Sequence, residues 1–200
     1  MKPAIIVVDM LKDNMRPQHA ISRGIRSILP SVRRLLSMAR ERGDRVVFAC
    51  DSFQPDDFIF QGRMKPHCIQ GTAGAEVIDE LSPGRDDLIL PKRRFSAFFQ
   101  TGLEKTLRAQ GVDTIAVAGV ATHFCVLTTA LDGICHDFKV IVIEDCCASY
   151  RAGIHQTTVS LYKRSPLHPL LRFMRLEEFS SLLEADQSEA VGGEGEREPS

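Results

Sequence analysis

Five short segments rich in β-branched and other apolar residues recur along the chain, without the polar alternation of a half-exposed strand. They are residues 4–8, 45–50, 87–90, 114–118 and 140–143. A strand without such alternation is buried on both faces, which favours a parallel sheet. Between the segments lie apolar residues at helical spacing, most clearly over residues 32–39, where Gly43 marks the helix end. Buried strands that alternate with helices form βαβ units.

This pattern predicts an α/β fold of three α/β/α layers around a six-stranded, mostly parallel sheet. The sixth strand is a short edge strand expected near residues 173–176. Residues 51–84 are rich in Gly, Pro and Asp, and we expect a loop with one short helix around residues 73–81. Residues 1–184 are interpreted as a single domain. Residues 185–200 carry five acidic side chains against one arginine, and we expect an acidic, disordered tail.

Charge and cysteine usage argue against several partners. The formal net charge of −1 provides no basic field for a nucleic-acid backbone. No apolar run approaches the roughly 18 residues of a membrane helix, and residues 4–8 are too few for a secretory signal. The six cysteines include no CxxC pair, which argues against a zinc ribbon or a thioredoxin-type motif. We therefore expect a cytoplasmic protein with reduced thiols and no nucleic-acid or membrane partner.

Reactive side chains follow several of the predicted strands. Asp9 follows the first strand, Asp51 the second and Lys92 the third, and the fourth leads through Gly119 to Cys125. In open parallel sheets, ligands bind beyond the carboxyl ends of the strands, and these ends share one edge of the sheet. The sequence therefore predicts that an acid, a base and a thiol meet at one site.

These residue types suit nucleophilic catalysis, although a lone cysteine such as Cys125 is more often a small buried side chain. A free thiol, with a pKa of about 8.5, is mostly protonated at neutral pH, and a cation or a helix N-terminus stabilises the thiolate. Cys125 lies at the start of a predicted helix, Lys92 can supply the cation, and Asp9 can move the proton. Backbone N–H groups of the turn at residues 119–121 can hold an oxyanion. Together these parts can hydrolyse an amide through a thioester.

Four segments carry a family resemblance: IIVVDMLKD, HCIQGTAGAEV, LPKRRFSAFFQTGLE and VAGVATHFCVLTTALDG. They follow one another over residues 4–133, and KVIVIEDCCAS extends the match to residue 149. In these segments the chain resembles the isochorismatase-like cysteine hydrolases, a family that includes nicotinamidases, N-carbamoylsarcosine amidase and ureidoacrylate amidohydrolase.

The resemblance implies a sheet of six parallel strands and a catalytic triad of Asp9, Lys92 and Cys125. It also implies a cis peptide bond between Val120 and Ala121, which aims the Ala121 and Cys125 amides at the substrate oxygen as an oxyanion hole. The implied reaction is hydrolysis of a C–N bond in a small carboxamide or ureido compound. The implied assembly is a homo-oligomer, either a dimer or a tetramer.

The resemblance is incomplete at the position of a metal. Metal-bearing nicotinamidases have an Asp-x-His pair after the second strand and a further histidine downstream. Asp51 and His67 match this pattern, but Phe53 stands in place of the first histidine. Catalytic zinc usually keeps three protein ligands. We therefore expect no required cofactor, and at most a weak half-site at Asp51 and His67 for a divalent metal such as zinc.

The substrate pocket must draw its aromatic side chains from Phe and Tyr, because the chain contains no tryptophan. The candidates for an aromatic wall are Phe53, Phe58, Phe60, Phe95 and Phe98. We expect Phe53 and Phe98 to line the pocket, with His123 at its rim. His123 is two residues from Cys125, and residues two apart on a helix do not face one another.

Two other functions stay open at this point. Isochorismatase-type hydrolysis of a vinyl ether would use Asp9 as a general acid and would need no thiol. A non-catalytic α/β module that binds a small molecule is the other alternative. The sequence contains neither GxGxxG nor GxxxxGK[ST], so dinucleotide and P-loop binding lack support.

Overall fold

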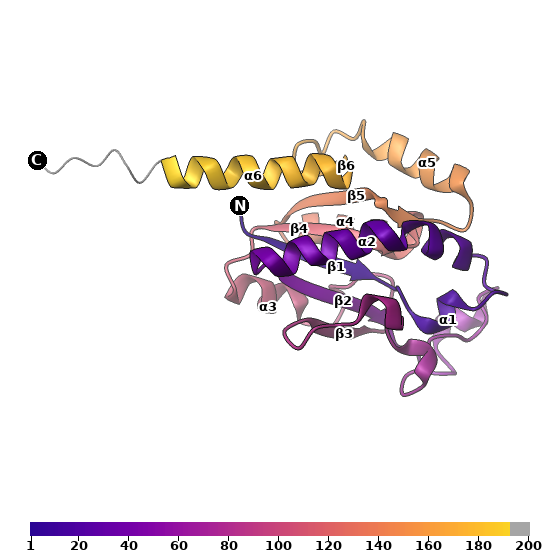
Figure 1. The fold of residues 1–200 in the computed structure, drawn as a ribbon. Helices are drawn as coiled ribbons and strands as arrows, with labels where there is room; N and C mark the ends of the chain where they lie inside the picture. The colour runs from indigo at the N-terminus through magenta and orange to yellow at the C-terminus, as the bar shows by residue number, and fades with distance from the viewer. Residues whose placement is uncertain (193–200) are drawn as a thin grey trace, which may run out of the picture.

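The computed structural model describes residues 1–192, with side chains through residue 188, and its centre is one six-stranded sheet (Figure 1). The strands are β1 (Pro3–Val8), β2 (Arg45–Asp51), β3 (Leu88–Lys92), β4 (Thr114–Val120), β5 (Lys139–Ala148) and β6 (Leu171–Met174). Their order is β3-β2-β1-β4-β5-β6, and every neighbouring pair is parallel. The predicted α/β class and the six-stranded parallel sheet are confirmed.

Helices cover the two faces of the sheet, as uninterrupted apolar strands require. One face packs against α2 (Ser22–Arg42) and α6 (Leu176–Gly192), and the other against α3 (Leu103–Ala109), α4 (Leu127–Cys135) and α5 (Ala152–Tyr162). Side chains of β1 alternate between the two cores: Ile5 and Val7 contact the first layer, and Ile6 and Val8 the second. A short helix, α1 (Lys12–Met15), follows β1.

The strand order places the candidate site. Because β1 lies between β2 and β4, the residue after β1 is flanked by the ends of both neighbours. Asp51 at the end of β2 lies in register with Lys92 at the end of β3. The end of β4 leads into the turn that carries Cys125. Four reactive residues from distant parts of the chain therefore reach the same edge of the sheet.

Two local predictions need correction. The expected helix around residues 73–81 is instead a pair of single 3-10 turns, Ala73–Ala75 and Asp79–Leu81, and a third turn covers Phe58–Gln61. The helix expected from residue 124 is divided into a π-helical turn, Thr122–Val126, and α4. Inside this turn the backbone angles of Phe124 (φ −121°, ψ −107°) are not helical, and the regular helix α4 begins only at Leu127.

The C-terminal segment also differs from expectation. Helix α6 continues to Gly192, so it includes the first part of the tail that we expected to begin at residue 185. Asp186 accepts a hydrogen bond of 2.8 Å from the N-terminal amine of Met1, which ties this acidic turn to the start of the chain. Residues 193–200 lie outside the described residues. Within residues 1–192, no helix is both long and apolar enough to cross a membrane.

Gly119 allows the close approach of β4 to β1 at the site. Its φ of +109° is one that side-chain-bearing residues rarely adopt, and an added Cβ would lie 2.1 Å from the backbone oxygen of Val8. We expect Gly119→Ala to lower the free energy of unfolding by about 2–6 kcal/mol, combining overpacking with backbone strain. Urea denaturation measures this change.

Gly153 provides the matched control for this prediction. It lies in α5, and an added Cβ would meet no atom within 4 Å. We expect Gly153→Ala to change stability by no more than about 1 kcal/mol, because alanine is the better helix former. Equal urea midpoints for the two variants would contradict the proposed role of Gly119.

Candidate active site

Lys92 is the central buried cation of the site. Its side chain is 1% exposed, and its Nζ atom donates to Asp9 Oδ2 at 2.9 Å and to Asp51 Oδ1. A third hydrogen bond, of 3.3 Å, goes to the main-chain oxygen of Arg94. One ammonium therefore holds two carboxylates, and the three side chains together carry a net charge of −1 when all are ionised.

Asp9 is fixed from several directions. It follows β1 with a φ of +53°, an uncommon conformation that Asp tolerates better than most residues. The main-chain N–H of Asp51 donates to Asp9 Oδ1 at 2.8 Å, while Lys92 holds Oδ2. The Asn14 side-chain amide donates to the main-chain oxygen of Asp9 at 3.0 Å. The carboxylate is therefore held in one orientation.

Cys125 lies in the π-helical turn that precedes α4, and its side chain is buried. Its Sγ atom and carboxylate oxygens of Asp9 and Asp51 all lie within 4.8 Å of one another. The structure thus brings together Asp9, Lys92 and Cys125, as the strand ends predicted. It adds Asp51 as a second carboxylate in direct contact with Lys92.

The pKa shifts follow from burial and from this group of charges. Burial raises the pKa of the Cys125 thiol well above its ordinary value, and Lys92 offsets only part of this rise. Burial and the charge of Asp9 raise the pKa of Asp51 to about 7. Burial on its own would lower the pKa of Lys92, but the charges of Asp51 and Asp9 raise it well above its ordinary value. Burial therefore favours the neutral form of the thiol, whereas the two carboxylates favour the charged form of the lysine.

The charge of Lys92 favours the thiolate of Cys125, which is the direction expected from the sequence. The three hydrogen bonds of its ammonium, however, go to oxygen atoms. Its effect on the sulfur is a longer-range attraction that burial outweighs. Carboxylate oxygens of Asp9 and Asp51 both lie within 4.8 Å of the sulfur.

The Asp51 shift has a consequence for stability. A carboxyl whose pKa is higher in the folded than in the unfolded chain binds its proton more tightly when folded. This group therefore contributes stability at low pH that is lost as the pH rises from about 4 through about 7. We expect Asp51→Asn to remove a slope of up to about 1.4 kcal/mol per pH unit in that window. Urea midpoints of both proteins at pH 5 and pH 8 test this. If the urea midpoint changes between pH 5 and pH 8 by the same amount in both proteins, the raised pKa of Asp51 is contradicted.

A small cavity of about 50 Å³ opens onto these groups. It is lined by Asp9, Asn14, Ile21, Asp51, Met64, His67, Phe95, Val120, Ala121, Phe124, Cys125 and Tyr150. The Val120–Ala121 peptide bond is cis, as the resemblance implied. Ala121 and Cys125 both border this space, so the two residues expected to form an oxyanion hole share one cavity with the thiol.

The three residues predicted for the substrate pocket do not line this cavity. Phe98 does not line the cavity but lies in the core on the α3 and α4 side, where its ring is 5.8 Å from that of Phe138. Phe53 is fully buried and its ring lies 5.5 Å from that of His67, which does line the cavity. His123 also stands outside the lining.

His123 packs against two aromatic residues that line the cavity. Its ring lies 4.6 Å from Phe124 and 5.3 Å from Tyr150, and its Nδ1 shares a 3.0 Å hydrogen bond with the Ser149 hydroxyl. The aromatic residues that line the cavity are Phe95, Phe124 and Tyr150. Phe95 was a sequence candidate. Phe124 could have been found from its place beside Cys125, whereas Tyr150 follows β5 and had no comparable signal.

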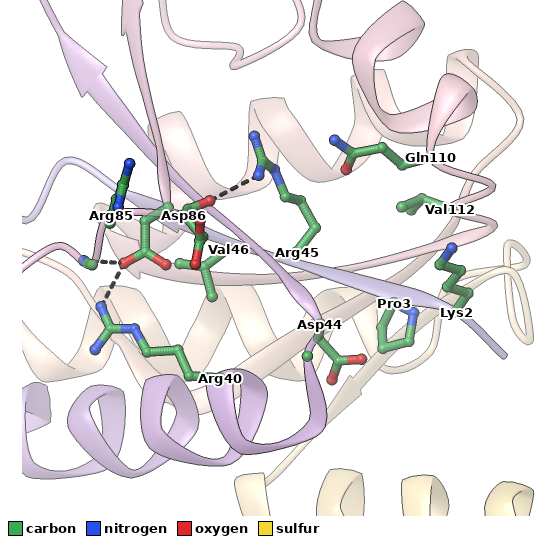
Figure 2. A pocket seen from close by; sticks show the side chains of 13 residues that line it. Lys2, Pro3, Arg40, Asp44, Arg45, Val46, Arg85, Asp86, Gln110 and Val112 are labelled. Carbon is green, nitrogen blue, oxygen red and sulfur yellow. Dashed lines mark hydrogen bonds and ion pairs between the residues drawn. The ribbon is translucent and has the colours of Figure 1, made fainter.

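A larger cavity, of about 560 Å³, lies at the opposite ends of the strands (Figure 2). Its lining includes Lys2 and Pro3 before and at the start of β1 and Arg45 at the start of β2. Two of its lining residues, Arg40 and Asp87, form an ion pair at 2.6 Å. It contains no thiol and none of the strand-end residues, so its size does not make it the reactive site.

Comparison with known proteins decides the family. The isochorismatase domain matches residues 3–168 of this chain. The chain belongs to the isochorismatase family. This match covers the five strands β1 to β5, and it makes the protein an isochorismatase-family hydrolase.

Individual relatives place it more closely within the family. The chain is 30% identical to maleamate amidohydrolase of Pseudomonas putida, over 79% of this chain and 78% of that protein. It is 34% identical to a probable inactive nicotinamidase of Arabidopsis thaliana, over 78% of this chain and 85% of that protein. A solved structure of the Pyrococcus horikoshii pyrazinamidase in complex with zinc has a TM-score of 0.75, with 28% identity, over 88% of this chain and all of that one.

The residues of this isochorismatase-family site do not fit a three-ligand catalytic zinc. Asp51 and His67 border the same cavity, but Asp51 already holds the ammonium of Lys92, and buried Phe53 offers no ligand atom. Within the described residues, the one group of three ligand-type side chains is Asp9, Asp51 and Cys125. Lys92 binds both of these carboxylates, so a cation there would compete with a buried ammonium.

Proposed function

We propose that the protein is a cysteine-dependent amidohydrolase, which cleaves the C–N bond of a small carboxamide or ureido compound through a thioester. The observation that carries the proposal is the meeting of Asp9 and Cys125 at one cavity, with Lys92 bonded to Asp9 behind them. The kinship with a maleamate amidohydrolase supports amide hydrolysis as the reaction.

In the first half of the reaction, the sulfur of Cys125 attacks the carbonyl carbon and its proton passes to Asp9. A carbon–sulfur bond forms, and the oxygen takes up negative charge next to the main-chain N–H groups of Ala121 and Cys125. Asp9 then gives the proton to the nitrogen as the C–N bond breaks. Ammonia or an amine leaves, and the acyl group remains on Cys125 as a thioester.

In the second half, water attacks the thioester and gives a proton to Asp9. The carbon–sulfur bond breaks, the acid leaves, and the proton returns to the sulfur, so the site is restored. Lys92 donates a hydrogen bond to Asp9 Oδ2, which holds the carboxylate in place for these proton transfers. No step requires a metal ion.

A screen for ammonia release tests this function. The panel contains nicotinamide, pyrazinamide, maleamate, a ureidoacrylate-type compound and N-carbamoyl amino acids, each with and without added zinc. We expect turnover of at least one compound, a protein mass increased by the acyl group during turnover, and no gain from zinc. No ammonia from any compound would contradict the proposal.

A further inference from the structure

A second cavity, of about 500 Å³, lies beside the catalytic one. We call it the basic annex because two arginines line it. Its lining includes His19, Ser22, Arg23, Arg26 and Tyr150. These come from the start of α2, the segment before it, and the residue that follows Ser149 after β5. Nothing in the proposed chemistry uses this space.

The annex adjoins the catalytic cavity at three points. Tyr150 lines both cavities. Ile21 lines the catalytic cavity, whereas the adjacent Ser22 lines the annex. The rings of His19 in the annex and His67 in the catalytic cavity lie 6.2 Å apart. The two cavities are therefore neighbours that share Tyr150 in their walls.

The two cavities have opposite electrostatic character. Asp9 and Asp51 border the catalytic cavity, but no acidic side chain borders the annex. Burial and the neighbouring His67 lower the pKa of His19, so the positive charge of the annex at neutral pH comes from Arg23 and Arg26.

The two arginines are available to a ligand. Both are exposed, and among the described residues neither forms an ion pair with a carboxylate, in contrast to Arg40 and Arg93. Arg26 donates one long hydrogen bond, of 3.3 Å, to the main-chain oxygen of Met15. A planar guanidinium with free donors is the protein group best matched to a carboxylate.

The size of the catalytic cavity limits what it can hold. The cavity volume of about 50 Å³ is enough for a few water molecules. A carboxamide group fits in this volume, but the rest of a substrate does not. The remainder must extend past Tyr150. On that side it meets the annex, where an anionic end is attracted, whereas the two carboxylates would repel it from the catalytic cavity.

We propose that the basic annex binds a carboxylate at the far end of the substrate, through Arg23 and Arg26. This inference rests on the proposed function and names its substrate class: amides that also carry a carboxylate, such as the monoamide of a short dicarboxylic acid, in preference to neutral amides. The amide end occupies the cavity at Cys125 and the acid end occupies the annex.

Binding to the Cys125→Ala protein tests the annex without turnover. The probes are succinamate, a monoamide acid, and succinamide, its neutral diamide, and the measurement is isothermal titration calorimetry. We expect succinamate to bind at least about tenfold more tightly, since hydrogen bonds to charged groups are the strong ones. Added salt should weaken the binding of succinamate and leave that of succinamide unchanged.

Paired arginine variants in the same background assign the effect to the annex. Arg23→Gln with Arg26→Gln should abolish the preference for succinamate. Arg33→Gln with Arg34→Gln is the control, because these exposed residues lie on the same helix and remove the same charge away from the annex. Circular dichroism verifies that each variant is folded.

The outcomes separate this inference from the proposed function. Three results would contradict carboxylate binding by the annex. They are equal or tighter binding of succinamide, no binding of succinamate, and a preference for succinamate that survives the loss of Arg23 and Arg26. Equal hydrolysis of the two compounds by the unmodified protein would overturn it too, while leaving a Cys125-dependent amidase intact. An arginine-dependent preference in a protein that hydrolyses no amide would support the annex and contradict the amidase.

Discussion

Replacing Cys125 with alanine is expected to reduce ammonia release by about 10⁴–10⁶-fold, since loss of a nucleophile removes the covalent step and leaves only the effects of binding. The fold should persist, because the change removes one buried sulfur and no hydrogen bond that holds the loop to its neighbours. Initial rates on a substrate found in the screen, together with the urea midpoint, measure both effects.

Cys135 provides the matched control. It is a free thiol at the exposed end of α4, outside the cavity. Cys135→Ala should retain full activity, and iodoacetamide should inactivate this variant as fast as the unmodified protein. Unreduced activity of Cys125→Ala would exclude the thioester mechanism.

The same Cys125→Ala protein distinguishes the two alternative functions. Hydrolysis of a vinyl ether by this variant, with loss of that activity on changing Asp9, would favour general-acid catalysis of the isochorismatase type. A Cys125 thiol that reacts no faster than free cysteine, in a protein inactive towards every amide, would favour a binding module. The kinship with a probable inactive nicotinamidase makes this comparison worth carrying out.

Replacing Lys92 with methionine is the second change with a large expected effect. It leaves Asp9 and Asp51 buried together without their shared cation. Removing one partner of a buried ion pair costs about 3–5 kcal/mol, so we expect the free energy of unfolding to fall by that amount at pH 8. Activity should fall below detection, because Asp9 would lose the hydrogen bond that holds its carboxylate in place.

The loss of stability should depend on pH. Without Lys92, the folded protein holds protons on these carboxylates more tightly than the unfolded chain does, so stability is highest at low pH and decreases as the pH rises. Urea midpoints at pH 5 and pH 8 should therefore show a smaller deficit at pH 5. Lys105→Met, at an exposed position on α3, is the control and should change neither midpoint.

A double variant separates structure from catalysis. Adding Asp51→Asn to Lys92→Met removes one of the two unpaired carboxylates, so part of the stability at pH 8 should return. Activity should not return, because Asp9 still lacks the hydrogen bond from Lys92 that holds its carboxylate in place. Recovery of activity along with stability would mean that Lys92 acts only as a structural residue.

The catalytic candidates were predictable because they follow strands. Asp9, Lys92 and Cys125 each come at or soon after the end of a buried apolar segment, and parallel strands direct those ends to one edge. Asp51 was found by the same rule but interpreted as half of a metal site. Its contact with Lys92 depends on the pairing of β2 with β3 in a particular register, which residue types alone do not reveal.

The pocket walls were not predictable in the same way. Phe98 and Phe95 lie three residues apart after β3, yet one is in the core and the other faces the cavity. The path of the chain through this loop decides which side each ring occupies. The side chains of a strand or helix face the core with a regular period that the sequence shows, whereas a loop has no such period.

The sequence by itself determined the layered α/β fold and the edge of the sheet where the chemistry lies. Both follow from local properties: burial on two faces, helical spacing, and the residue that comes after each strand. Only the tertiary structure decided that Lys92 is shared by two carboxylates, that burial raises the pKa of the Cys125 thiol, and that Tyr150 lines both the cavity at Cys125 and the basic annex. These features depend on distances and burial between residues far apart in the chain, which exist only once the strands and loops have packed.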